Sequence, residues 1–159
     1  ALPSNGLHTN GYSLARKVLF EVGKLPVEEV ADELLAPHRC YAPAILPILV
    51  AGDTIKAMAH ITGGGFYDNI PRILPERCSA QIQRGSWPEL PIFQAIRKQG
   101  QIEDAEMFRV FNMGIGMMLI VDSEIAPEVV ERLGALGEKA YVIGSVEKRQ
   151  KDAQPVVIA

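Results

Sequence analysis

A run of three glycines, Gly63-Gly64-Gly65, is the segment of the sequence best suited to bind an anion. It follows an apolar alternation that ends at Thr62 and precedes a segment with helical character. Consecutive glycines leave backbone N–H groups open to a phosphate, and the start of a helix adds positive potential. The run is neither a P-loop nor a GxGxxG motif. Taken alone, such a triplet more often forms a tight turn. A purely structural turn is therefore the first interpretation, and phosphate binding is the second.

Three histidines could take part in proton transfer or phosphate contact. His8 lies in a polar loop, where we expect an accessible imidazole, although a loop histidine bonded to nearby backbone is the commoner case. His60 is expected on the same strand face as Thr62, where it could support the glycine turn or simply be a core histidine. His38 has no converging partners in the sequence.

A third candidate segment, residues 111–116, places Asn112 and Gly114 at the entrance to a strongly apolar run. A substrate could approach the backbone there. The alternative is that the glycines relieve packing or form a bulge, and spacing alone favours it. The neighbouring methionines are typical of core filling rather than of a cofactor site.

The helices and strands expected around these segments alternate along the chain. Helical patterns are expected at residues 14–22, 27–35, 43–50, 66–74, 88–99, 103–110 and 127–136, and strand patterns at residues 54–62, 78–83, 116–121, 141–146 and 155–158. The run 116–121 is apolar throughout and suits a central strand. Pro47 should kink or shorten its helix. The alternation favours a layered sheet covered by helices.

Composition sets further limits on function. The 159 residues suit one domain, and 48% hydrophobic with 22% charged residues is ordinary for a globular chain. A net charge of −3 without a long basic cluster argues against nucleic-acid binding. The longest apolar stretch, 41–52, is too short to span a membrane, and no signal peptide precedes it, so we expect a cytoplasmic protein. Cys40 and Cys78 predict neither a zinc site nor a disulfide, and we expect reduced thiols in packed positions.

Three segments together resemble a single enzyme family. They are GLHTNGYSLAR at residues 6–16, HITGGGFYDNIP at residues 60–71 and FNMGIGM at residues 111–117. Their order, their spacing and the LLAP run at residues 34–37 are similar to phosphoribosylformylglycinamidine cyclo-ligases, also called aminoimidazole ribonucleotide synthetases. The HTNGYSL run favours this family over its relatives, which include selenophosphate synthetase, thiamin-monophosphate kinase, a hydrogenase maturation protein and a glutamine-dependent amidine synthase.

The resemblance implies a fold and a domain assignment. Residues 1–159 correspond to the C-terminal domain of these ligases, an α+β domain with α/β/α layers and a mixed β-sheet covered by helices. The family's N-terminal domain, which is absent from this sequence, forms the homodimer and holds most of the ATP and Mg²⁺ site. The active site lies between the two domains. We therefore expect no metal-binding residue in this chain and no activity from the isolated domain.

The resemblance also implies a reaction and the residues that serve it. In the family, ATP phosphorylates the formyl oxygen of formylglycinamidine ribonucleotide, a nitrogen closes the imidazole ring, and phosphate leaves. The glycine turn Gly63-Gly64-Gly65 with Thr62 then corresponds to the phosphate loop. His8, a candidate for catalysis, lines the substrate cleft with Thr9 and Asn10, and Asn112 and Gly114 shape its floor. The alternative is a phosphate- or nucleotide-binding module without catalysis.

Overall fold

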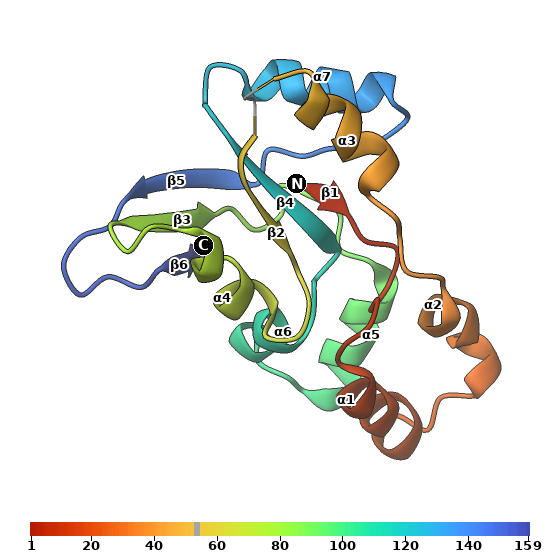
Figure 1. Cartoon of the computed structure of the whole chain (residues 1–159). Helices are drawn as coiled ribbons and strands as arrows, with labels where there is room; N and C mark the ends of the chain where they lie inside the picture. The colour runs from red at the N-terminus through yellow and green to blue at the C-terminus, as the bar shows by residue number, and fades with distance from the viewer. Residues whose placement is uncertain (53–54) are drawn as a thin grey trace.

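Two three-stranded β-sheets form the centre of the computed structural model, which describes residues 1–52 and 55–159 (Figure 1). The first sheet has the order β1-β4-β2 and is antiparallel, with strands Leu2–Pro3, Ile115–Val121 and Ile55–His60. The second has the order β5-β3-β6, with strands Gly144–Lys148, Cys78–Ile82 and Val156–Ile158. In it β3 pairs antiparallel with β5 and parallel with β6. The α+β class is confirmed, and the strands divide into two sheets.

Strand β4 is the central strand of its sheet, as its apolar run predicts. Strand β2 follows the predicted alternation, with Ala59 buried and Lys56 exposed. Thr54, where this strand was expected to begin, lies outside the described residues. The strand expected at residues 141–146 instead begins at Gly144, because Tyr141 donates its backbone N–H to Ala1 (2.9 Å) before pairing with β3 starts.

The helices lie close to the predicted ranges. The α-helices are α1 Tyr12–Arg16, α2 Ala31–Leu35, α3 Ala42–Val50, α4 Gly65–Asn69, α5 Pro91–Gly100, α6 Asp104–Val110 and α7 Ala126–Ala135. A π-helix at Lys17–Val22 continues α1, and short 3₁₀ turns occupy Val27–Glu29 and Pro71–Ile73. Helix α3 continues past Pro47 to Val50, so the expected shortening is wrong. Pro47 is exposed, and this placement keeps its ring out of the core.

Two hydrophobic clusters stabilise these layers. Helices α3 and α7 cover one side of the first sheet (Figure 1), where Leu2, Ile48 and Leu133 share the smaller cluster. The larger cluster joins both sheets to α1, α5 and α6, and Phe66 and Phe93 are fully buried in it. None of the helices in the described ranges is both long and apolar enough to cross a membrane.

The two cysteines are free thiols, which confirms that they form no disulfide with each other. Cys40 is exposed, so the prediction that both lie in packed positions is wrong for this residue. It lies in the segment between α2 and α3, outside any helix or strand that would turn its side chain toward the core.

Strand direction brings the three sequence motifs to one place. Because β1 and β2 both run antiparallel to β4, the ends of β1 and β2 and the start of β4 lie at the same edge of the first sheet. The first motif follows β1, the glycine turn follows β2, and the third motif precedes β4. Segments distant in sequence therefore meet at this edge.

Candidate functional site

Asn112 connects the third motif to the first. Its side chain is 0% exposed, and its Oδ1 accepts hydrogen bonds from the Ser4 hydroxyl (2.8 Å) and the Gly114 N–H (2.9 Å). Its Nδ2 donates to the carbonyl oxygens of Gly6 (2.8 Å) and Leu7 (3.2 Å). All of these contacts are internal, so in this structure Asn112 fixes the shape of the loop that carries His8.

Asn10 connects the first motif to the glycine turn. Its Nδ2 donates to the carbonyl oxygen of Val110 (2.6 Å), and a Cβ placed on Gly63 would lie 3.9 Å from the Asn10 Cβ. Its Oδ1 is buried and has no hydrogen-bond partner in the described part of the chain. A buried acceptor is rarely left unpaired, so this oxygen is available to a ligand. Thr9, in contrast, is exposed and carries its hydroxyl at the surface.

The glycine turn needs glycine for reasons of space and conformation. Gly64 and Gly65 have φ values of 92° and 56°, in the left-handed region that other residues rarely adopt. A Cβ on Gly65 would overlap the carbonyl oxygen of Phe108. The Gly65 N–H closes the turn by donating to Thr62 O (2.9 Å). The predicted passage from a strand through a glycine turn into a helix is confirmed.

Asn69 holds this turn, and the sequence analysis missed it. The side chain is buried, and its Nδ2 donates to the carbonyl oxygens of Gly65 (2.8 Å) and Thr62 (3.2 Å). The Thr62 hydroxyl donates back to Asn69 Oδ1 (3.2 Å). An asparagine shortly after a glycine turn is a signal for such backbone capture, since its amide often satisfies nearby carbonyl groups.

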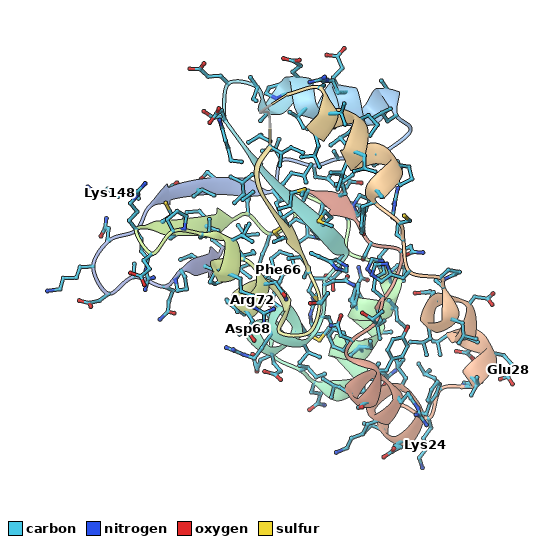
Figure 2. The ribbon with its side chains drawn as sticks, in the orientation of Figure 1. Lys24, Glu28, Phe66, Asp68, Arg72 and Lys148 are labelled. Carbon is cyan, nitrogen blue, oxygen red and sulfur yellow. The ribbon has the colours of Figure 1, made fainter. Side chains whose placement is uncertain are left out.

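Two charged side chains of opposite sign, Asp68 and Arg72, lie on or next to the helix that follows the glycine turn (Figure 2). The Asp68 carboxylate lies against Gly64, where an added Cβ would meet it. Arg72 donates from Nη1 to Asn69 Oδ1 (3.2 Å), and the Arg109 guanidinium lies 5.4 Å from the centre of the Tyr67 ring. An anion at the turn would therefore be repelled by one carboxylate, and the two arginines are the nearby charges that can offset this repulsion.

His8, His38 and His60 form a histidine cluster at the end of β2, the strand that leads into this turn. One ring nitrogen of each residue lies within 4.8 Å of those of the other two. The expectation that His38 has no converging partner is therefore wrong, because the chain between α2 and α3 returns to the first sheet. His60 is not a core residue, since it and His38 meet at the surface. His8 is only 7% exposed, contrary to the expected accessible imidazole, because His38 packs over it with ring centres 4.0 Å apart.

The environment of the histidine cluster keeps two of its rings neutral. Burial, with smaller contributions from His38, His60 and Arg39, lowers the pKa of His8 to about 4. Burial, with a smaller effect of His38, also lowers the pKa of His60. A neutral imidazole offers one donor and one acceptor, so near pH 7 these rings can bind a ligand without carrying charge.

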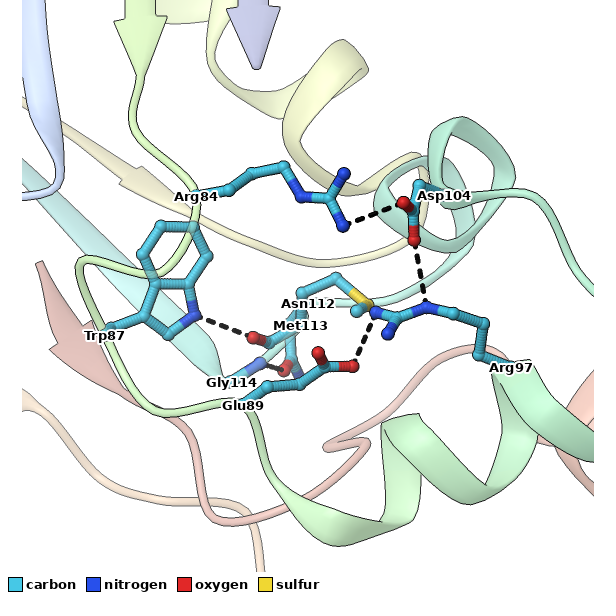
Figure 3. Close-up of polar contacts among 8 residues, drawn as sticks. All are labelled: Arg84, Trp87, Glu89, Arg97, Asp104, Asn112, Met113 and Gly114. Carbon is cyan, nitrogen blue, oxygen red and sulfur yellow. Dashed lines mark hydrogen bonds and ion pairs between the residues drawn. The ribbon is translucent and has the colours of Figure 1, made fainter. Parts of the chain in front are cut away.

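Behind the third motif lies a cavity of about 440 Å³ that the sequence did not indicate (Figure 3). Arg84 pairs with Asp104 (2.7 Å), and Arg97 pairs with Glu89 (2.6 Å) and Asp104 (3.0 Å). Trp87 donates its indole N–H to the carbonyl oxygen of Met113 (2.8 Å). These charges compensate one another, so the cavity wall supports the Met113–Gly114 turn and offers no net charge to a ligand.

Comparison with known proteins identifies relatives over nearly the whole chain. Residues 1–155 match the family described as AIR synthase related protein, C-terminal domain. A phosphoribosylformylglycinamidine cyclo-ligase of Syntrophus aciditrophicus (strain SB) is 48% identical over 98% of this chain and 47% of its own length. One of Geobacillus thermodenitrificans (strain NG80-2) is 52% identical over 91% of this chain and 44% of its own length. The chain thus spans about half the length of these relatives.

A solved structure shows the same fold at low sequence identity. The crystal structure of E. coli HypE, a hydrogenase maturation protein, superposes with a TM-score of 0.62 and 20% identity. It covers 100% of this chain and 47% of the HypE chain. At this identity the likeness concerns the fold alone.

Proposed function

The chain belongs to the family of AIR synthase related proteins, as their C-terminal domain, and we propose that it forms the substrate-binding part of a phosphoribosylformylglycinamidine cyclo-ligase. Such an enzyme closes the imidazole ring of formylglycinamidine ribonucleotide in purine biosynthesis. ATP phosphorylates the formyl oxygen, a nitrogen of the substrate attacks the formyl carbon, and phosphate leaves with ADP as the second product. The proposed setting is a homodimer in the cytoplasm.

The observation that carries this proposal is the meeting of the three motifs at one edge of the first sheet. Both reactants bear phosphate groups, and Gly63 of the glycine turn is exposed, as is Arg72, which bonds to Asn69, the residue that holds this turn. The unpaired Oδ1 of Asn10 is an acceptor suited to an N–H or hydroxyl group of the substrate. Asn112, which is itself bonded to Gly114, keeps the first motif in place through its hydrogen bond to Gly6.

The residues of this chain do not fit the Mg²⁺ ion that accompanies ATP. Mg²⁺ prefers near-octahedral oxygen ligands. Within the described ranges, one group of three or more His, Cys, Asp or Glu side chains lies close enough to share an ion, and it is the histidine cluster. Its ligand atoms are nitrogens rather than oxygens. We therefore assign the ATP-bound Mg²⁺ to the other part of the ligase, and derive no step of the reaction from it.

His8 has a positioning role in this proposal. As a buried neutral ring fixed by Asn5, it suits a hydrogen bond to the substrate better than donation of a proton. In an active ligase, His8→Ala should therefore raise KM more than it lowers kcat. A general acid or base would instead contribute about 10²–10⁴-fold to kcat.

A chimera tests the proposed function. The 159 residues replace the matching segment of the G. thermodenitrificans ligase, to which they are 52% identical. We expect ATP-dependent formation of aminoimidazole ribonucleotide and ADP, with the parent ligase as the positive control. A folded chimera that binds the substrate nucleotide but forms no product would favour a binding module, and one that neither binds nor reacts would refute the proposal.

A further inference from the structure

The three histidines of the sequence all lie in one cluster, although they come from separate segments. His8 comes from the loop after β1, His38 from the segment between α2 and α3, and His60 from the end of β2. Imidazole nitrogens brought together from different elements are a common way of binding transition metals in proteins.

The separation of His38 and His60 suits two ligands of one ion. Their Nε2 atoms lie 3.2 Å apart. Two nitrogens that bind zinc at roughly 2.0–2.1 Å in tetrahedral geometry lie about 3.3 Å from each other. The Nδ1–H of His38 donates to the carbonyl oxygen of Arg39 (2.9 Å), which leaves the lone pair of Nε2 directed toward His60. A backbone carbonyl in this position is the usual support of a metal-binding histidine.

His8 is held by a similar support. Asn5 donates from Nδ2 to the carbonyl oxygen of Pro37 (2.7 Å), which orients the amide so that Oδ1 faces the His8 ring. Asn5 Oδ1 then accepts the Nε2–H of His8 at 2.9 Å. The proton on Nε2 leaves Nδ1 as a bare acceptor, and Nδ1 is buried without a hydrogen-bond partner in the described residues. A buried nitrogen left unpaired in this way is explained by a ligand that it binds.

The charges near the cluster permit a cation. Arg39 is the adjacent positive group, and it forms an ion pair with Glu138, which compensates its charge.

We propose that His8, His38 and His60 bind a divalent transition metal such as Zn²⁺, with a fourth position open to water or to an oxygen of a ligand. His38 and His60 meet at the surface, so an ion has a path to the site. Nitrogen ligands select Zn²⁺, Co²⁺ or Ni²⁺ over Mg²⁺ and Ca²⁺. This site is distinct from that of the metal that accompanies ATP. It shares His8 with the proposed substrate cleft, so a bound ion would occupy the Nδ1 acceptor of His8 in place of a substrate group.

Binding of Zn²⁺ alone tests the proposal. The 159-residue chain, without a histidine tag and freed of metal with a chelator, is titrated with ZnCl₂ by calorimetry at pH 7.5. We expect one Zn²⁺ per chain, and Co²⁺ in its place should give the visible absorption of a four-coordinate ion. MgCl₂ should give no saturable binding at this site.

Two variants and one control decide the result. His38→Ala and His60→Ala change accessible side chains and should each weaken Zn²⁺ binding at least tenfold, with circular dichroism confirming that they remain folded. Cys40→Ser removes an exposed thiol from the same segment as His38 and should leave the affinity unchanged. The proposal fails if the folded chain binds no stoichiometric Zn²⁺. It also fails if binding persists in both histidine variants or depends on Cys40.

Discussion

The three glycines of the glycine turn differ in how well each position could accept a side chain. Gly65 has a positive φ, and its missing side chain lets the carbonyl oxygen of Phe108 approach. Gly63 has neither constraint, since the nearest atom to a Cβ there would be the Asn10 Cβ at 3.9 Å. Replacing each of these three glycines should therefore cost a different amount of stability, because only two of them adopt the left-handed conformation.

Gly65→Ala should destabilise the chain more than Gly63→Ala. The left-handed conformation alone costs roughly 1–2 kcal/mol, and the overlap with Phe108 adds to it. Gly63→Ala should stay within about 0.5 kcal/mol of the unmodified chain. Urea unfolding followed by circular dichroism measures both free energies of unfolding. Equal losses in the two variants would show that the turn is not built as described.

The buried His8 should make stability depend on pH. The pKa of His8 is lowered to about 4, chiefly by burial, whereas an unfolded histidine titrates near 6.5. Between these values the unfolded chain binds a proton that the folded chain does not, so the free energy of unfolding should fall as the pH is lowered from about 6.5 to about 4.

His8→Gln provides the comparison for this pH dependence. Urea unfolding at several pH values, with a chelator present, should show a smaller fall for the variant over the same range. Some dependence should remain, because the pKa of His60 is also lowered. Parallel curves for the two proteins would contradict the assignment.

At the scale of elements, antiparallel pairing places the motif loops together and Asn112 fixes them. The loop after β1 and the start of β4 are separate segments, and the Asn112 amide bonds to both. Because these groups are buried, each one needs its partner: a buried donor or acceptor without one costs about 1–3 kcal/mol. The side chain is therefore expected to matter for stability as well as for the site.

Asn112→Ala should lower the free energy of unfolding by at least about 2 kcal/mol, because it leaves several buried groups unpaired. Ser4→Ala is the matched control, since it removes one hydrogen bond to Asn112 Oδ1 and should cost about 1 kcal/mol. Both values come from urea unfolding. If Ser4→Ala costs as much as Asn112→Ala, the asparagine is not the common connection between the loops.

At the scale of the whole molecule, the two sheets are joined through the larger hydrophobic cluster rather than through continuous strand pairing. A cavity of about 610 Å³ with mostly apolar walls lies between them and α7, lined by residues of both sheets such as Ala59, Ile82 and Val146. The candidate site lies at the edge of the first sheet, where three loops meet.

By itself, the 159-residue chain should not catalyse ring closure. The described residues offer no cluster of carboxylates for Mg²⁺, and the relatives are about twice as long. Incubation with ATP, Mg²⁺ and formylglycinamidine ribonucleotide should give no product above a control without protein. The remaining part of a cyclo-ligase, added separately or fused, should restore turnover. Measurable product from the chain alone would overturn this expectation.

The sequence by itself determined the alternation of helices and strands, the central position of β4 and the passage from β2 through the glycine turn into α4. These features depend on local periodicity and on glycine conformations, which neighbouring residues control. Only the tertiary structure decided that His38 meets His8 and His60, that Asn69 and Asn112 hold the loops, and that the strands divide into two sheets. These features depend on contacts between segments far apart in the chain, and the side-chain pattern of one segment does not specify which other segment will pack against it.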